Sequence, residues 1–174
     1  FLRPNDRMVL LELQADECTL LQARFAGDRQ VVVQRQDGYA GLRAFLPPKE
    51  RRGLVLIDPP YESDREYEQV AEALKVAHDR WSSGIYALWY PIKARPPIER
   101  FHRALAATGI RKMLLVEFAP YPEDSSFRLN GCGMVVVNPP WKLEETLRQL
   151  LPELLDVLRQ HPAARTGLSW LVPE

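Results

Sequence analysis

The sequence predicts an α/β fold, doubly wound around a mostly parallel sheet with an antiparallel finish. Apolar runs of strand length alternate with segments of helical periodicity along the 174 residues, which is typical of strand–helix–strand units. The run Gly53–Asp58 is apolar almost throughout, as in a strand buried on both faces. The runs Arg111–Pro120 and Cys132–Asn138 lie too close in sequence for a crossover helix between them, so these two strands are predicted to pair antiparallel.

The first part of the chain is predicted to hold two strands with a helix between them. The strands are Arg7–Leu13, rich in aliphatic residues, and Gln30–Gln34, with three β-branched residues in a row. The helix covers 16–27, with Asp16 as its cap and Gly27 at its end. Its inward face is predicted to hold Leu20, Leu21 and Phe25. A short turn or helix then leads to the two prolines at 47 and 48.

The rest of the chain is predicted to alternate in the same way. After the strand at 53–58, an amphipathic helix over 64–81 has one apolar face, formed by Tyr67, Val70, Ala71, Leu74 and Ala77. A strand at 84–92 precedes a helix over 96–109 that begins with proline and ends at glycine. A long helix over 142–161, with a kink expected at Pro152, has Leu143, Leu147, Leu150, Leu154 and Leu158 at helical spacing. A strand at 167–174 closes the chain.

Composition limits the possible classes of protein. The net charge is zero and the pI is about 7.0, so any attraction to nucleic-acid phosphates must come from local patches. Two cysteines and three widely spaced histidines match neither a disulfide framework nor a metal site. No apolar run is long enough to span a membrane and no signal peptide is visible. We therefore expect a cytoplasmic protein, a monomer without metal, that acts away from membranes.

The stretch Asp58-Pro59-Pro60-Tyr61 is the strongest candidate for a catalytic site. Ligands of such sheets bind at the carboxyl ends of the strands, and this motif directly follows a predicted strand. The two prolines stiffen the backbone and carry no N–H, so the Asp58 carboxylate and a nearby carbonyl form two acceptors aimed at one place. Such a pair can hold the exocyclic amino group of a base while Tyr61 stacks on its ring. The simpler interpretation is a Pro-Pro turn with a solvated aspartate.

Two further acidic positions follow strand ends in the same order along the chain. Glu12 ends the first predicted strand, and Asp37 with Gly38 follows the second. An acid after a strand commonly binds a ribose hydroxyl, and an aspartate beside a glycine can accept a hydrogen bond from an adenine amino group at close backbone approach. With Asp58, these residues predict a nucleoside pocket. A second Pro-Pro stretch, Asn138–Lys142, is instead interpreted as a turn into the last helix. The alternative is a substrate contact, for which Asn138 offers an acceptor and Trp141 a stacking ring.

Several blocks of the sequence resemble one family of enzymes. They are GLVLIDPPYE, GIYALWYPIK, ATGIRK, GMVVVNPPWKLE and the terminal SWLVPE, and the likeness extends from about Leu10 to Glu174. This pattern is similar to that of the RlmJ-type adenine N6-methyltransferases of large-subunit ribosomal RNA. The resemblance implies a Rossmann-like fold and S-adenosylmethionine as methyl donor, with one adenine of naked 23S ribosomal RNA methylated before subunit assembly.

The resemblance also assigns roles to residues. Glu12 would bind the ribose of the donor, and Asp37 with Gly38 its adenine. Asp58 would engage the target amino group next to the donor, and either Asp58 or water would take the proton. Pro59, Pro60 and Tyr61 would complete the motif. From their place after a predicted strand end, Lys93 and Arg95 are our candidates for phosphate contacts. Weaker basic candidates are Lys49–Arg52, Arg100, Arg103, Arg111, Lys112 and Lys142.

The chain also departs from the family. Family members begin with a further segment that carries a helical insertion, a central first strand and the glycine-rich turn that holds the methionine part of the donor. We therefore expect residues 1–174 to be the C-terminal portion of a single Rossmann-like methyltransferase domain, and to bind the donor poorly and methylate nothing alone. The alternatives are a DNA adenine or protein glutamine methyltransferase, and a non-catalytic nucleic-acid-binding protein linked to the uptake or use of external DNA.

Overall fold

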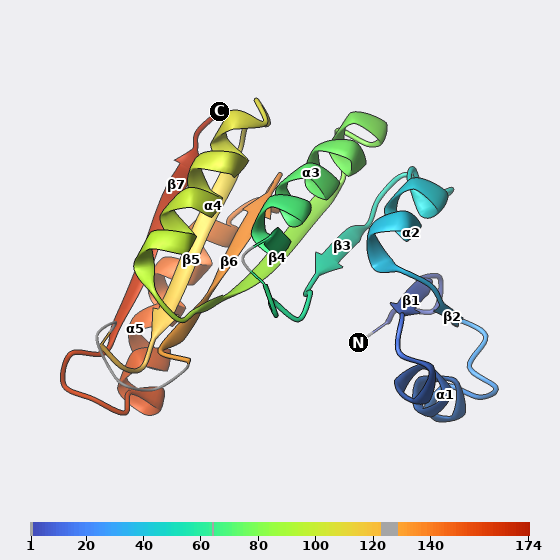
Figure 1. The fold of residues 1–174 in the computed structure, drawn as a ribbon, viewed down its shortest axis with the longest axis horizontal. Coiled ribbons are helices and arrows are strands. Elements are labelled where there is room, and N and C mark those ends of the chain that lie inside the picture. The colour runs from blue at the N-terminus through green and yellow to red at the C-terminus, as the bar shows by residue number, and fades with distance from the viewer. Residues whose placement is uncertain (1, 64, 123–128) are drawn as a thin grey trace. The chain divides into compact units, whose positions relative to one another are not determined.

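The computed structural model describes residues 2–63, 65–122 and 129–174 and divides the chain into two compact units, Phe1–Leu46 and Pro47–Glu174. Each has a sheet of its own: two strands in the first unit and five in the second. The helices and strands are coloured along the chain in Figure 1. In the described segments, none of the helices has the length and apolar character needed to cross a membrane.

The first unit is a β-α-β-α segment. Its elements are β1 (Met8–Glu12), α1 (Ala15–Arg24), β2 (Val31–Arg35) and α2 (Gly38–Phe45). β1 and β2 pair in parallel with a register from Met8 opposite Val31 to Glu12 opposite Arg35. Because the pair is parallel, both strands end at the same edge, where the Gln36 N–H donates to the Glu12 carbonyl at 3.1 Å. The two predicted strands and the short helix after them are confirmed.

Helix α1 differs from its prediction at both ends and on its inward face. It begins after Gln14, which makes no side-chain cap, so Asp16 lies within the first turn and the predicted Asp16 cap is wrong. Aspartate is still favourable there, because the helix dipole stabilises acids in the first turn. The helix ends at Arg24, and Gly27 lies beyond it with φ of +86°. Leu20 is exposed, and the buried residue of the helix is Cys18.

The second unit is a five-stranded mixed sheet with helices on both faces. Its strands are β3 (Leu54–Ile57), β4 (Ile85–Ile92), β5 (Met113–Ala119), β6 (Gly131–Val137) and β7 (Arg165–Val172). The strand order is β3-β4-β6-β5-β7. Its helices are α3 (Arg65–Arg80), α4 (Arg95–Ala107) and α5 (Leu143–Leu158). Figure 1 shows α3 and α4 side by side over one face of this sheet and α5 on the other.

Strand directions define two edges of this sheet. β3 is parallel to β4, while β6 is antiparallel to both β4 and β5, and β7 is antiparallel to β5. Thus β3, β4 and β5 all end at one edge, which we call the carboxyl edge, where β6 and β7 begin. The opposite edge is the amino edge. The predicted antiparallel pairing of the strands at 111–120 and 132–138 is confirmed.

The core of the second unit lies between the sheet and helices α3 and α4. All five residues predicted for the inward face of α3 are buried. Two prolines occupy the first turn of α4, where the missing N–H costs no helical hydrogen bond. Gly109 follows the helix with φ of +77°, the left-handed conformation that commonly ends helices. The largest fully buried side chains are Tyr86, Tyr90 and Phe101.

The prediction that β3 is buried on both faces is wrong. Its residues Leu54 and Leu56 are 64% and 63% exposed. Alternate residues of a strand share one face, so one face of β3 is largely exposed. In α5, two of the five leucines at helical spacing, Leu150 and Leu158, are exposed, and Leu151 is the buried leucine of the helix. Leu151 follows Leu147 by four residues, about one turn of the helix. α5 is one helix from Leu143 to Leu158 with Pro152 inside it.

Candidate active site

The loop after β3 carries the predicted catalytic motif at the carboxyl edge. Asp58 is exposed, and within the described part of the chain its carboxylate has no hydrogen-bond partner. Pro59 and Pro60 supply no N–H, so this part of the loop presents only oxygen acceptors. The arrangement suits a ligand that donates hydrogen bonds, such as an amino group.

Tyr61 holds this loop against the sheet. Its φ is +50°, which is rare for a residue with a large side chain and is a form of strain that clusters at functional sites. The ring is only 4% exposed and lies 4.7 Å from the Tyr67 ring and 6.2 Å from the Trp89 ring, centroid to centroid. Its hydroxyl donates to the Trp89 carbonyl at 2.7 Å. Stacking of Tyr61 on a base therefore stays a prediction and requires that the ring be uncovered.

Lys93 and Arg95, the predicted phosphate contacts, follow β4 at the same edge. The ammonium of Lys93 donates to the backbone carbonyl of Tyr61, with 3.1 Å between Nζ and O. The guanidinium of Arg95 donates from Nη1 to both carboxylate oxygens of Glu117, at 2.9 and 3.1 Å. Both cations thus have partners inside the protein. Their contact with RNA phosphate stays a prediction.

A polar network behind the carboxyl edge was missed in the sequence. The buried Tyr90 hydroxyl lies 2.8 Å from Glu117 Oε1, to which it donates, and 2.9 Å from His102 Nε2. Burial and then the Glu117 charge raise the pKa of Tyr90, and burial lowers the pKa of His102. Gly133 leaves room for the Tyr90 ring, since a Cβ at position 133 would collide with it. The sequence signal for this network was Glu117, a charged residue within the otherwise apolar strand at 113–119.

Asn130 fixes the start of β6 to the end of β4. It is the buried polar residue of the described chain, at 1% exposed. Its N–H donates to the Ile92 carbonyl at 2.8 Å, and its side-chain Nδ2 donates to the Lys93 carbonyl at 3.3 Å. The Tyr121 N–H donates to the Asn130 carbonyl at 3.3 Å. These bonds pin the backbone from which the Lys93 side chain starts.

Glu12, Asp37 and Gly38 lie together at the carboxyl ends of β1 and β2, in the first unit. Glu12 Oε1 accepts the Gln14 N–H at 2.6 Å. Asp37 is the N-cap of α2, and its Oδ1 accepts the Tyr39 N–H at 2.8 Å. Each carboxylate keeps a second oxygen with which to accept a ligand hydroxyl or amino group. Gly38 begins α2, and an added Cβ there would meet nothing within 4 Å.

The stretch Asn138–Lys142 lies at the amino edge, away from Asp58. Asn138 follows β6, and its Nδ2 donates to the carbonyls of Ser82 and Gly84, both at 2.8 Å. Asn138 thus joins two turns of this edge, in agreement with the prediction of a turn into the last helix. Trp141 is 87% exposed, with the Lys142 ammonium 4.5 Å from its ring centroid.

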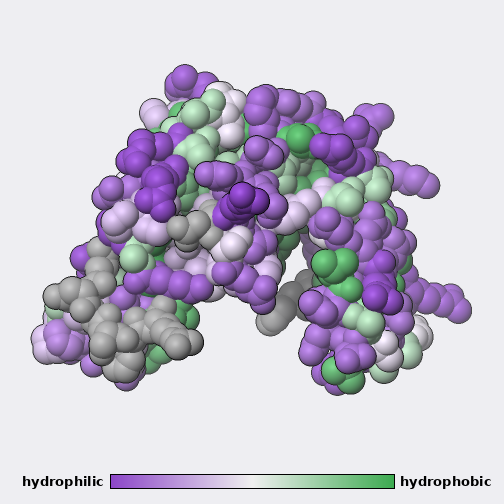
Figure 2. Space-filling model, viewed as in Figure 1, coloured by the Kyte–Doolittle hydropathy of each residue, from purple (hydrophilic) through white to green (hydrophobic). Residues whose placement is uncertain are grey.

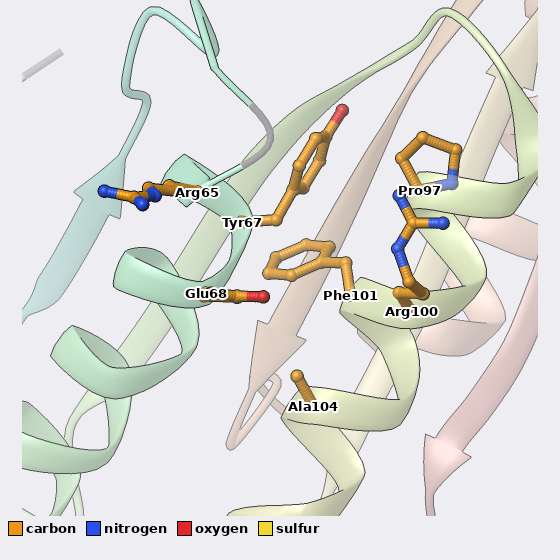
Figure 3. Close-up of a pocket in the computed structure, with 7 residues that line it drawn as sticks. All are labelled: Arg65, Tyr67, Glu68, Pro97, Arg100, Phe101 and Ala104. Carbon is orange, nitrogen blue, oxygen red and sulfur yellow. The ribbon is translucent and has the colours of Figure 1, made fainter.

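A cleft of about 310 Å³ opens between the first turn of α3 and residues Pro97 to Ala104 of α4. Figure 3 shows Tyr67 and Phe101 projecting between the helices, with Pro97 and Arg100 on the α4 side. Tyr67 connects this cleft to the Asp58 loop through its ring contact with Tyr61. The faces visible in Figure 2 are mostly hydrophilic with scattered apolar residues. In the described ranges, no group of three or more His, Cys, Asp or Glu residues could hold a metal ion.

The strand order and the motif at the carboxyl edge define the class of the protein. An α/β chain that pairs these strands and carries Asp-Pro-Pro-Tyr after β3 has the fold of the Rossmann-like methyltransferases. More narrowly, the chain belongs to the family described as ribosomal RNA large subunit methyltransferase D, RlmJ, whose sequence model matches residues 1–172.

Two relatives and one solved structure support this placement. The chain is 41% and 42% identical, over 173 residues, to proteins named ribosomal RNA large subunit methyltransferase J from Haemophilus influenzae and Escherichia coli K12. The matched region makes up 99% of this chain and 62% of the length of each relative. The crystal structure of protein LPL1258 from Legionella pneumophila, of family DUF519, matches with a TM-score of 0.87 and 31% identity over 97% of this chain and 62% of that one.

Proposed function

We propose that the full-length protein transfers a methyl group from S-adenosylmethionine to the N6 amino group of one adenine in 23S ribosomal RNA. Membership of the RlmJ family over residues 1–172 is the observation that carries this proposal. The exposed Asp58 carboxylate and the Pro59-Pro60 backbone, which has carbonyls but no N–H, support it, because an adenine amino group is a double hydrogen-bond donor. The substrate is the naked RNA before subunit assembly, and the enzyme acts as a cytoplasmic monomer.

Asp58 is the catalytic residue of this proposal. Its carboxylate accepts one N–H of the target amino group, and a carbonyl of the Pro59-Pro60 segment accepts the other. Holding both hydrogens turns the nitrogen lone pair toward the methyl group, which is a positioning and electrostatic effect. As the nitrogen gains its methyl group it loses one proton, to Asp58 or to water. Pro59 and Pro60 keep the loop stiff, and Tyr61 holds it to β4 through the Trp89 carbonyl.

The residues at the ends of β1 and β2 fit the donor. Its ribose hydroxyls and adenine amino group are hydrogen-bond donors, and Glu12 and Asp37 each present a carboxylate oxygen with capacity to accept. The open space at Gly38 allows an adenine ring to approach the backbone. S-adenosylmethionine, when bound, supplies the electrophilic methyl group. The remaining part of its site is assigned to the residues that the relatives have beyond the 62% covered by this chain.

Identification of the methylated nucleoside tests the proposal. The full-length protein is incubated with labelled S-adenosylmethionine and, in parallel, unmodified 23S ribosomal RNA, assembled large subunits and duplex DNA. Chromatography of the digested nucleic acid should place the label in N6-methyladenosine from naked RNA. Label found only in DNA would mean that the substrate is DNA and not ribosomal RNA. Donor binding without transfer to any nucleic acid would contradict the proposed reaction.

A further inference from the structure

The loop that carries Asp58 is held in a strained conformation by contacts from β4. Tyr61 has φ of +50°, so the loop needs fixed partners to keep this backbone in place. Tyr61 makes two hydrogen bonds of opposite kinds to the end of β4: its hydroxyl donates to the Trp89 carbonyl at 2.7 Å, and its own carbonyl accepts from Lys93 Nζ at 3.1 Å. The Lys93 bond is made to the backbone of the loop itself.

The starting point of the Lys93 side chain is itself fixed. Its carbonyl accepts from the side chain of Asn130, and the carbonyl of Ile92 accepts from the Asn130 N–H. Two residues further on, Arg95 is held on Glu117 by two contacts. The backbone around Lys93 is therefore anchored to β6 on one side and to β5 on the other. An ammonium on a fixed backbone reaches the Tyr61 carbonyl with less loss of freedom than one on a mobile loop.

We propose that Lys93 is a positioning residue of the methyl-transfer site, which orients the Asp58–Tyr61 loop through the Tyr61 carbonyl. This inference rests on the proposed function, in which Asp58 must face the target amino group. The ammonium fixes the peptide that follows Tyr61, and this peptide with the two prolines sets the direction of the Asp58 carboxylate. The competing role is the phosphate contact predicted from the sequence, in which the same ammonium binds the RNA backbone.

The two roles differ in what they change. A phosphate contact contributes to RNA affinity and to its salt dependence, and loss of one such contact lowers the slope of log K against log salt by about 0.7 to 0.9. A positioning residue leaves affinity and slope unchanged and lowers kcat at saturating donor and RNA. An arginine at position 93 retains a donor for the carbonyl, whereas a methionine has similar length and no donor.

The experiment uses the full-length protein with Lys93→Met, Lys93→Arg and, as a matched surface control, Lys75→Met. Lys75 pairs with Asp79 on the exposed face of α3, so its replacement removes a charge away from the carboxyl edge. We expect Lys93→Met to lower kcat tenfold or more with unchanged RNA affinity and salt slope. Lys93→Arg should retain most of the activity, and Lys75→Met all of it. An unchanged kcat, or a fall in affinity with a shallower slope, would overturn the proposal.

Hydrogen–deuterium exchange without RNA separates this inference from the proposed function. Lys93→Met should speed exchange several-fold at the amides of Tyr61, Glu62 and Ser63, and Lys75→Met should not. If the wild type methylates no RNA but exchange changes as expected, the reaction is wrong and the positioning role stands. If exchange in the loop is unaltered, Lys93 does not position it, whatever the substrate.

Discussion

Replacement of Gly38 by alanine tests the donor site, because it should separate donor binding from stability. Gly38 is the first residue of α2, its φ is not positive, and an added Cβ would meet no atom within 4 Å. The protein itself therefore has no need of glycine here. Alanine in a helix is more favourable than glycine by about 0.5–1 kcal/mol, so Gly38→Ala should leave the free energy of unfolding unchanged or raise it by up to this amount.

Donor affinity should move in the opposite direction. If the adenine of S-adenosylmethionine packs against the Gly38 backbone, the new methyl group occupies the place of the ring. A tenfold or greater loss of affinity, equivalent to about 1.4 kcal/mol or more, is then expected. Gly27→Ala is the matched control, since a Cβ there also meets nothing within 4 Å but φ is +86°. It should cost roughly 1–2 kcal/mol of stability with donor affinity retained.

Isothermal titration calorimetry with S-adenosylmethionine and urea unfolding of the full-length protein measure the two quantities. Wild-type affinity in Gly38→Ala would refute a contact between this residue and the donor. A loss of stability in Gly38→Ala would instead show that the helical conformation of this residue is wrong.

Three further predictions concern the second unit. Tyr90→Phe should destabilise the protein by about 2 kcal/mol in urea unfolding, because Glu117 loses a hydrogen bond to a charged group. Tyr86→Phe, which loses bonds to the Ala77 and Trp81 carbonyls, should cost about 1 kcal/mol, and a reversed order would contradict the role of the network. Burial lowers the pKa of His102 below its ordinary value, so as the pH falls below about 6.5 the unfolded chain takes up a proton at this residue more readily than the folded protein does. The free energy of unfolding should therefore decline from pH 7 to pH 5. Thermal unfolding should show a shallower decline in His102→Gln. Asn138→Ala should lower the free energy of unfolding by about 1–3 kcal/mol, since two carbonyls lose their donor. At a temperature where the variant is folded, its kcat should be unchanged. A loss of kcat would place the amino edge in the reaction.

Much of the fold could be predicted from the sequence because the relevant signals are local. The inward face of α3, the prolines that begin α4 and the glycine that follows it depend on helical periodicity and backbone preference. Antiparallel pairing of β5 with β6 followed from loop length alone. The exposure of Leu54 and Leu56 could not be predicted in this way, since an apolar run has the same appearance whether one face of the strand or both are covered.

The sheet edge at which the candidate residues lie was predictable, and their contacts were less so. Strand direction brings Asp58, Lys93 and Arg95 to one edge, as expected from strands that run in parallel. The partners of the two cations could not be predicted, because Glu117 is 22 residues from Arg95, and Tyr61 is 32 residues from Lys93. Such long-range pairs depend on register, which the pattern of apolar residues does not determine across several strands.

The most direct test of the central claim is single-turnover methyl transfer to naked 23S ribosomal RNA by the full-length protein and its Asp58→Asn variant. The control is Asp79→Asn, which alters an exposed aspartate paired with Lys75 on α3. With Asp58 as the residue that holds the target amino group, Asp58→Asn should be slower by about 10²–10⁴-fold, while RNA and donor affinities stay within about twofold and the control retains wild-type activity. A rate within threefold of wild type in Asp58→Asn would contradict the assignment of this loop as the catalytic site.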